Sequence, residues 1–315
     1  MTAPAERCMA RTRRSLWASN AKSSRTEISK MATMSEDAEQ GLRERVQEAE
    51  RRIFEHPGYL ELVRCETLRR TLTAVFVPNW QELLALLDRA ATDVGLALEL
   101  IQNVHRPDVR ERFEAATVQR LHNYVAGTMT LVDHTRRIMR ARSGAIPDEF
   151  AKRKALLLAN PEVPFVQDLR NFTLHRSLPF LGHTLSLSNV NTPGQQMECE
   201  VELSVAELAA SDGWSPSSRA YLLAQDKAVA LRPVIRRHGE FAAAINSWLH
   251  DALAKANEQA LADVNRLVVE RNAILSGTDA ATAARLTQHW TRLRQTPAAE
   301  QSGDVAAFRL TGDDP

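Results

Sequence analysis

Apolar side chains recur every three or four residues through most of the chain, which is the spacing of one face of an α-helix. The repeat is clearest after Tyr59, where it runs through Leu62, Cys65, Leu68, Leu72 and Val75. Pro57-Gly58 precedes this stretch and Pro78 follows it, and proline disrupts the interior of a helix. We therefore expect a helix that ends before Pro78, and further helices over about 35–56, 79–105, 108–142 and 147–159.

A second long helical pattern covers the region from about Asp226 to near Leu275. It contains Pro233, where we expect the helix to bend. The apolar positions available for a core are Phe241, Ile245, Trp248, Leu249, Ala252, Ala256, Leu261, Val264, Leu267 and Val268. A helix this long usually spans a whole bundle or pairs with a second chain.

Between these helical regions the pattern changes to strict alternation. Residues 183–190 and 196–204 flank the turn sequence Asn191-Thr192-Pro193-Gly194. In the second segment Met197, Cys199, Val201 and Leu203 alternate with Glu198, Glu200 and Glu202. This pattern predicts a β-hairpin with one apolar and one acidic face. Because two strands alone are only marginally stable, we expect the apolar face to pack on helices.

These elements predict a mainly α fold, a helical bundle with a small β-hairpin insertion at about 183–204. We expect one helical domain over 36–275, in which Ser204 with Glu207 and Ser215-Pro216 begin further helices. Residues 1–35 are rich in Arg, Ser and Thr and lack apolar periodicity, which predicts a disordered N-terminus. Translation could also start at Met31 or Met34. Residues 276–315 are polar, which predicts a mostly disordered tail with one weak helix near 282–295 and an acidic end.

The charge composition limits how the chain could bind nucleic acid. Forty basic and 39 acidic residues give a net charge of +1, so the chain is not coated in positive charge, and any contact with nucleic acid must be local. Only six of the basic residues are lysine. We attribute the excess of arginine to coding bias rather than to phosphate binding.

Cysteine usage and hydropathy suggest a location in the cytoplasm. Cys8, Cys65 and Cys199 lie far apart, which favours neither a disulfide framework nor a zinc site. No run of about 18 apolar residues is present, so we expect no association with a membrane. The chain has no glycine-rich phosphate loop, no His-Glu-x-x-His sequence and no nucleophile-elbow serine, and we expect no cofactor and no metal.

One short stretch, Val166 to Pro179, combines groups that could perform chemistry. At about 100° per residue, a helix here places Phe165, Val166, Leu169 and Phe172 on one apolar stripe. Asp168, Asn171 and His175 cluster within roughly 60° of each other beside that stripe. The polar groups therefore line the edge of a buried face.

The sequence Arg170-Asn171 followed by His175 resembles the Arg, polar residue, spacer, His motif of the HEPN superfamily. An Arg followed by His five to seven residues later occurs four times in this chain, but only here does Asn follow the Arg on an apolar helical stripe. The resemblance extends to the helix-rich setting from about Ser35 to Leu178. Thr130 to Arg137 is also similar to the long helix that precedes the motif in some bacterial members.

Many HEPN proteins are metal-independent endoribonucleases, and others are inactive relatives. The resemblance implies catalytic roles for Arg170, Asn171 and His175, an RNA or nucleotide partner, and a homodimer in which two chains share a cleft. Asp133 and His134 are candidates for a second site, provided that the helix over 108–142 faces the motif.

Helical geometry raises an objection to this site. On a regular helix Arg170 and His175 point about 140° apart and are separated by roughly 7.5 Å along the axis. They would converge if the helix is distorted, if the arginine curls back, or if two chains face each other across a twofold axis. The alternative is a non-catalytic helical scaffold or interaction protein. In that case Arg170 pairs with an acid on a neighbouring helix, and His175 caps a carbonyl or packs under the hairpin.

Overall fold

The computed structural model describes residues 36–101, 107–188, 196–277, 279 and 284. The predictions of a disordered N-terminus over 1–35, of the hairpin turn at 191–194 and of the tail helix near 282–295 lie outside these residues, except for residue 284.

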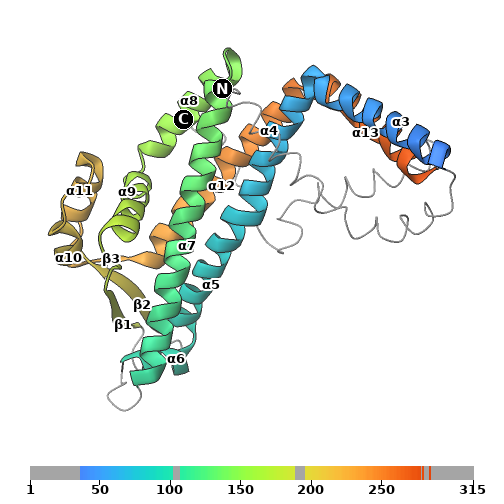
Figure 1. Cartoon of the computed structure of the whole chain (residues 1–315). Helices are drawn as coiled ribbons and strands as arrows, with labels where there is room; N and C mark the ends of the chain where they lie inside the picture. Colours follow the sequence, from blue (N-terminus) through green and yellow to red (C-terminus); the bar gives the residue numbers. More distant parts are fainter. Residues whose placement is uncertain (1–35, 102–106, 189–195, 278, 280–283, 285–315) are drawn as a thin grey trace. The chain divides into compact units, whose positions relative to one another are not determined.

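The described chain is mainly helical and carries a small antiparallel sheet of three strands (Figure 1). The predicted mainly α class with a β-hairpin is confirmed at this level. The helices are α3 (Glu36–Glu55), α4 (Pro57–Thr71), the π-helical turn η1 (Leu72–Phe76), α5 (Val77–Thr92), α6 (Val94–Ile101), α7 (Pro107–Arg140), α8 (Ala145–Leu158), α9 (Glu162–His175), α10 (Val205–Ala209), α11 (Pro216–Leu223), α12 (Leu231–Ala256) and α13 (Glu258–Ser276). The strands are β1 (Leu181–Ser188), β2 (Gln196–Ser204) and β3 (Ala228–Ala230).

Where we expected one domain over 36–275, the chain divides into two compact units. Unit 1 contains α3, the start of α4 and α13, and unit 2 covers residues 63–257. In unit 1, α3 packs along α13, with Ile53, Val264 and Leu267 buried. Arg52 and Glu270 form an ion pair of 3.1 Å between the two helices. Unit 1 therefore has a small apolar contact of its own.

The predicted helix end before Pro78 is wrong. Helical structure continues from Pro57 through η1 to Thr92, and Pro78 lies within the first two positions of α5. In a regular helix the proline ring would clash with the carbonyl four residues earlier. The wider π-helical turn directly before Pro78 relieves this clash, because its hydrogen bonds skip one more residue.

Two other predicted helices are interrupted. Asp93 adopts an extended conformation, and its Oδ1 accepts a hydrogen bond of 3.1 Å from Leu96 N, so it ends α5 and caps α6. Residues 228–230 form β3 instead of helix, and Pro233 lies in the first turn of α12, where a proline does not bend the axis. The single helix predicted to reach Leu275 also stops at Ala256, since Asn257 leaves the helical conformation.

The sheet follows the predicted alternation and gains a third strand. In β2 the side chains of Cys199, Val201 and Leu203 are buried, and this strand packs against α5. Leu203 also pairs with Val229 of β3, which joins the sheet to the start of α12. The extra strand supports a hairpin that would be marginal alone.

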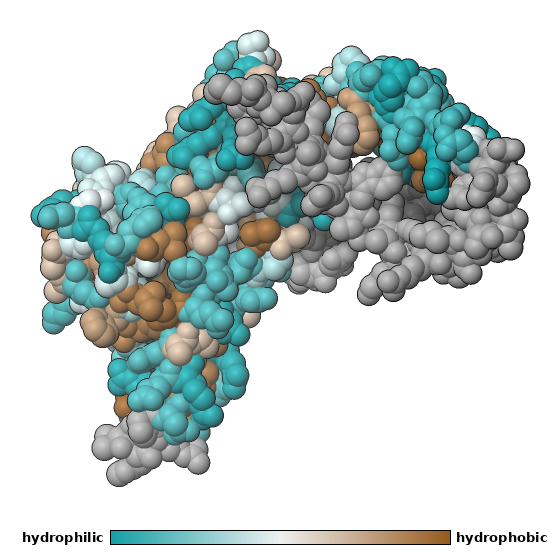
Figure 2. Space-filling model, in the orientation of Figure 1, coloured by the Kyte–Doolittle hydropathy of each residue, from teal (hydrophilic) through white to brown (hydrophobic). Residues whose placement is uncertain are grey.

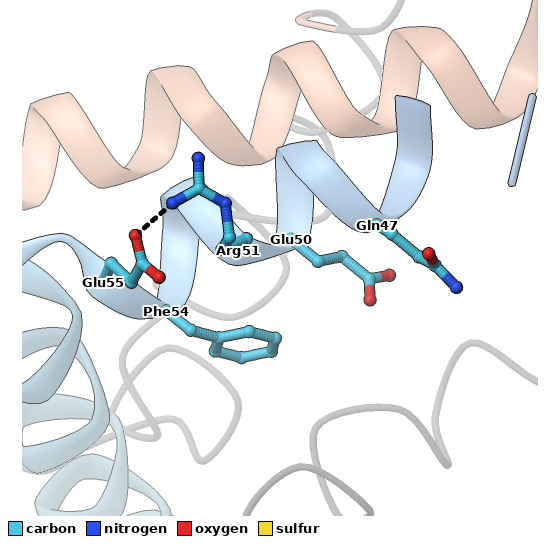
Figure 3. A pocket seen from close by; sticks show the side chains of 5 residues that line it. All are labelled: Gln47, Glu50, Arg51, Phe54 and Glu55. Carbon is cyan, nitrogen blue, oxygen red and sulfur yellow. Dashed lines mark hydrogen bonds and ion pairs between the residues drawn. The ribbon is translucent and has the colours of Figure 1, made fainter. Parts of the chain in front are cut away.

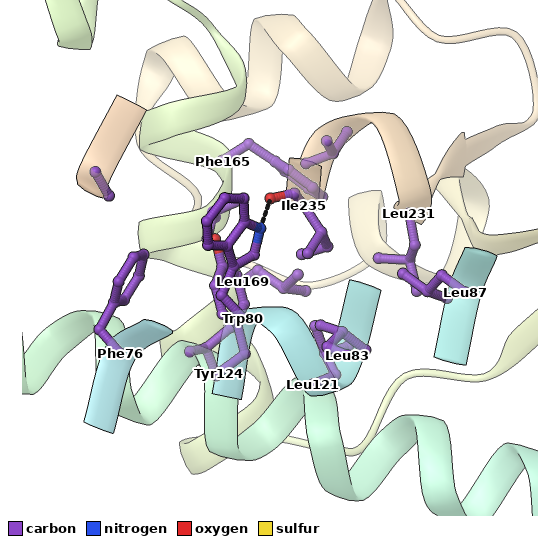
Figure 4. Packing of buried hydrophobic residues seen from close by; sticks show 14 of the residues in the cluster. Phe76, Trp80, Leu83, Leu87, Leu121, Tyr124, Phe165, Leu169, Leu231 and Ile235 are labelled. Carbon is purple, nitrogen blue, oxygen red and sulfur yellow. Dashed lines mark hydrogen bonds between the residues drawn. The ribbon is translucent and has the colours of Figure 1, made fainter. Parts of the chain in front are cut away.

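The core of unit 2 is closed by Trp80 of α5 packing against α12 (Figure 4). The indole Nε1 donates a hydrogen bond of 3.0 Å to the carbonyl oxygen of Ile235. A Cβ atom built on Gly239 would lie 2.0 Å from Trp80 Nε1. Only glycine at position 239 therefore leaves room for the indole.

A buried polar pair joins α7 to α12 in the same core. Tyr124 and His238 are 0% and 3% exposed, and the tyrosine hydroxyl hydrogen-bonds to His238 Nδ1. Burial lowers the pKa of His238 to about 4 and raises the pKa of Tyr124 well above its usual value. At neutral pH the imidazole is therefore uncharged, the phenol keeps its proton, and the two groups share a neutral hydrogen bond.

We expect Gly239→Ala to destabilise the protein by about 3 kcal/mol, because the added methyl group collides with Trp80 and breaks its hydrogen bond. The control is Gly41→Ala in α3, where no atom lies within 4 Å of the new Cβ. That change should stabilise the helix slightly, since alanine has the higher helix propensity. Urea unfolding followed by circular dichroism measures both, and equal stability of the two variants would contradict the packing argument.

The free energy of unfolding should fall as the pH drops from about 6.5 towards 4. In this range His238 binds a proton in the unfolded state but not in the folded state. The full contribution of neutral His238 is present above pH 6.5, and about 3 kcal/mol is lost by pH 4. In His238→Gln the free energy of unfolding should vary less steeply over this range, whatever its absolute value. His250→Gln, on the outer part of α12, should keep the wild-type slope.

Candidate functional site

The motif helix α9 has the apolar stripe that the sequence predicted. Phe165, Val166, Leu169 and Phe172 are at most 4% exposed. The stripe packs against α7 and against the aromatic side chains that follow the sheet, with Trp214 stacked 5.7 Å from Phe165 and 5.8 Å from Phe172. The polar edge of α9 is therefore fixed in its rotation by the core.

Asp168 ties this polar edge to α11. Its Oδ2 accepts hydrogen bonds from Ser215 N at 2.9 Å and from the Ser218 hydroxyl at 2.6 Å, at the N-terminus of α11. A carboxylate at this position satisfies free backbone donors and complements the helix dipole. Asn171 and His175 follow Asp168 one and two turns later on the same face of α9. That face is therefore turned towards the start of α11.

The start of α9 is fixed by an ion pair to α12. Glu162 is 8% exposed and forms a 2.7 Å ion pair with Arg237 of α12. Together with Asp168, this contact fixes both halves of α9 within unit 2. The motif thus lies on a rigid helix rather than on a loop, which suits a site that needs fixed geometry.

The structure brings Arg170 and Asn171 together. Arg170 Nη1 donates a hydrogen bond of 3.1 Å to Asn171 Oδ1, so the guanidinium is directed towards the Asn171 side of the helix. Arg170 Nε is buried and has no hydrogen-bond partner. Asn171 and His175 are both exposed and lie one turn apart. The arginine therefore curls towards the face that carries the imidazole.

His175 remains open to solvent at the last position of α9. Within the described residues it makes no hydrogen bond, either to the motif or to a backbone carbonyl. Arg170 likewise forms no ion pair with an acid of a neighbouring helix in the part of the chain that the structure describes. The two contacts expected of a purely structural motif are thus not found among these residues.

Asp133 and His134 lie on α7 and contact other partners. His134 Nδ1 is 2.7 Å from the Thr71 hydroxyl of α4, and burial followed by the nearby Arg137 charge lowers the pKa of His134. Asp133 pairs with Arg136 at 3.4 Å on the exposed side of α7. Across the described residues, neither side chain contacts Arg170, Asn171 or His175, so their role as a second site stays a prediction.

His183 on β1 is a buried titratable group that the sequence did not single out. Its side chain is 3% exposed, neither ring nitrogen has a hydrogen-bond partner, and Glu114 Oε1 lies 3.8 Å from Nδ1. Burial lowers the pKa of this imidazole. The alternation of β1 predicts that His183 faces inward, but the sequence does not reveal the nearby Glu114.

Apolar surface lies next to the motif. Leu178 and Phe180, directly after α9, are 56% and 78% exposed. Figure 2 shows hydrophobic surface in this part of unit 2, near the sheet and the end of α9. The site therefore has a polar edge and an adjoining apolar edge.

A pocket of about 240 Å³ lies elsewhere, in unit 1. It is lined by Gln47, Glu50, Arg51, Phe54 and Glu55 of α3 (Figure 3). Arg51 is held by Glu55 and Glu48, each at 2.7 Å, so its charge is already compensated within α3. The pocket offers no arrangement of groups that suggests a reaction.

The described residues offer little support for a metal site or for a reactive thiol. Among the described residues, no three His, Cys, Asp or Glu side chains are grouped so that they could hold a metal ion. Cys65 and Cys199 are free, and burial raises the pKa of both thiols, which disfavours the reactive thiolate. In the part of the chain that is described, no helix combines the length and the apolar character needed to cross a membrane.

We expect Asp168→Ala to lower the free energy of unfolding by about 1 to 3 kcal/mol, because it removes the acceptor for Ser215 N and for the buried Ser218 hydroxyl. Asp168→Asn keeps one acceptor oxygen and should cost less. The matched control is Asp133→Ala, which removes only an exposed ion pair and should change stability by less than about 0.5 kcal/mol. Thermal or urea unfolding distinguishes these variants.

Comparison with known proteins provides no relative on which a function could be based. No family model matches the chain, and neither the curated proteins nor the solved structures contain a significant match. The resemblance to the HEPN superfamily therefore depends on Arg170, Asn171 and His175 and on their helical setting.

Proposed function

We propose that the protein is a HEPN-like RNA-binding protein that cleaves RNA without a metal ion through Arg170, Asn171 and His175. The observation that carries this proposal is the Arg170–Asn171 hydrogen bond on a helix face that also presents exposed His175. The bond directs the guanidinium towards Asn171, which on a helix lies between Arg170 and His175 around the axis.

Each side chain has a chemical role in this proposal. Cleavage of RNA needs a base for the 2′-hydroxyl, stabilisation of the charged phosphorane and an acid for the leaving 5′-oxygen. Histidine titrates near neutral pH and serves as base or acid. Arginine is a permanent cation whose fork matches phosphate oxygens, and Asn171 would orient the imidazole or bind the phosphate.

A single chain supplies one histidine at this face, whereas the reaction uses both a base and an acid. A homodimer that places two copies of the motif in one cleft would supply the second imidazole. The exposed Leu178 and Phe180 support this arrangement, because a second copy would cover apolar surface directly beside His175.

The second candidate function is a non-catalytic helical scaffold that holds RNA or another partner without cleaving it. The observation that favours it is the anchoring of α9 by Asp168 to α11 and by Glu162 to α12. These contacts make α9 a structural element of unit 2 whether or not its exposed edge reacts.

We expect His175→Ala and Arg170→Ala to reduce EDTA-resistant RNA cleavage by about 100-fold or more, because a general acid–base group and the phosphate-binding cation are lost. His175 is exposed and Arg170 is half-buried without an ion pair among the described residues, so the melting temperature should change little. Fluorescent RNA oligonucleotides measure the cleavage, and differential scanning calorimetry measures the stability.

Arg89→Ala and His250→Ala are matched controls, on α5 and α12 respectively, and should retain full cleavage. Cleavage that persists in both motif variants would contradict the nuclease assignment. If the motif variants mainly lower the melting temperature, the scaffold function is favoured instead. RNA binding without cleavage by the wild-type protein, measured by fluorescence anisotropy, would favour the scaffold that holds RNA.

A further inference from the structure

Helix α8 has no buried residue, although it belongs to unit 2. One side of it contacts α12 and α9, with the Arg153 guanidinium 4.4 Å above the Trp248 ring. Glu149 pairs with this arginine at 2.9 Å. The opposite side of α8 is left without a partner among the described residues.

This opposite side, which we call the outer face of α8, is both apolar and basic. It consists of Asp148, Ala151, Lys152, Lys154, Ala155, Leu156 and Leu158, all of them exposed, so that two lysines lie on the same face as one acid. Leu156 is 72% exposed and Leu158 is 38% exposed. At 100° per residue, the alanines and Asp148 form the centre, with one lysine and one leucine on each flank. Such a face suits a segment that offers apolar side chains together with acids.

The charge of this face is not neutralised by its surroundings. Within the described residues, neither Lys152 nor Lys154 forms an ion pair, and Asp148, one turn before Lys152, does not pair with it. Glu149 is occupied by Arg153. With Asp148 on the same face, the two lysines leave a net charge of +1 for an acidic partner, and they are two of only six lysines in the whole chain.

The chain itself contains a segment of the complementary composition. Residues 300–315, outside the described part, carry Glu300, Asp304, Asp313 and Asp314 against the single basic residue Arg309. Val305, Phe308 and Leu310 lie between these acids. We propose that residues 300–315 bind the outer face of α8, with their apolar side chains on Leu156 and Leu158 and their acids near Lys152 and Lys154.

Chain length permits this contact for any arrangement of α12 and α13. Trp248, which contacts α8, lies about 15 Å before Asn257 along α12. Helix α13 begins after Asn257, has 19 residues and is about 30 Å long. The end of α13 is therefore no further from Trp248 than the sum of these two lengths. Residues 278–299 span up to about 70 Å when extended. A tethered segment also has an effective concentration of the order of millimolar, so a weak contact is sufficient.

The apolar side chains favour a peptide over RNA as the occupant. Lysines alone would suit a phosphate backbone, but nucleic acid bases stack on aromatic side chains, and the outer face of α8 has none. Exposed Leu156 gains from an occupant that removes it from water, which Phe308 and Leu310 would do.

Zero-length carbodiimide cross-linking of the full-length protein tests the proposal, because it joins a lysine amine to a carboxylate in contact with it. An equal mixture of ¹⁵N-labelled and unlabelled protein distinguishes links within a chain from links between chains. We expect Lys152 or Lys154 to link to Glu300, Asp304, Asp313 or Asp314 of the same chain. The yields should be several-fold above those from the exposed Lys227 and Lys255.

Leu156→Gln should lower these yields by roughly fivefold, because it removes apolar contact and leaves both lysines in place. Leu223→Gln, a matched change of a 64% exposed leucine on α11, should leave them unchanged. Equal yields from all four lysines, or yields that Leu156→Gln does not change, would overturn the proposal. Links that join labelled to unlabelled chains would assign the surface to a second copy and would overturn it as well.

Discussion

The close approach of Trp80 to Gly239 determines how the helices of unit 2 can pack. Because residue 239 has no side chain, α5 and α12 come near enough for the indole to reach the Ile235 carbonyl. α5 in turn supports β2 and α7, and α12 continues from β3. The sheet, the long helix α7 and the motif helix that packs on it are all arranged around this one crossing.

The sequence predicted those parts of the fold in which local pattern and tertiary packing agree. The apolar stripe of α9, the alternation of β2 and the cap formed by Ser204 and Glu207 are of this kind. The predictions were wrong where tertiary packing outweighed the local sequence signal. Pro78 is accommodated by a π-helical turn, and β3 is too short to show alternation and exists because Val229 pairs with Leu203.

The site shows the same division between local and long-range information. The sequence placed Asn171 and His175 on one edge of α9, and the structure adds the hydrogen bond from Arg170 to Asn171, while the convergence of Arg170 with His175 stays a prediction. The position of Asp168 beside them was also predicted, but its partners were not. Ser215 and Ser218 lie 47 and 50 positions further along the chain, and nothing in the spacing identifies them as the groups that a carboxylate on α9 would cap.

The absence of buried side chains from α8 also affects how the protein fluctuates. A helix whose side chains are at most partly buried opens at a lower free energy than fully packed elements, so we expect α8 to unwind before the rest of unit 2. Such opening would not release the motif helix, even though only three residues separate α8 from α9. The carboxylates of Glu162 and Asp168 hold α9 to elements that lie much later in the chain, so the position of α9 does not depend on α8 alone.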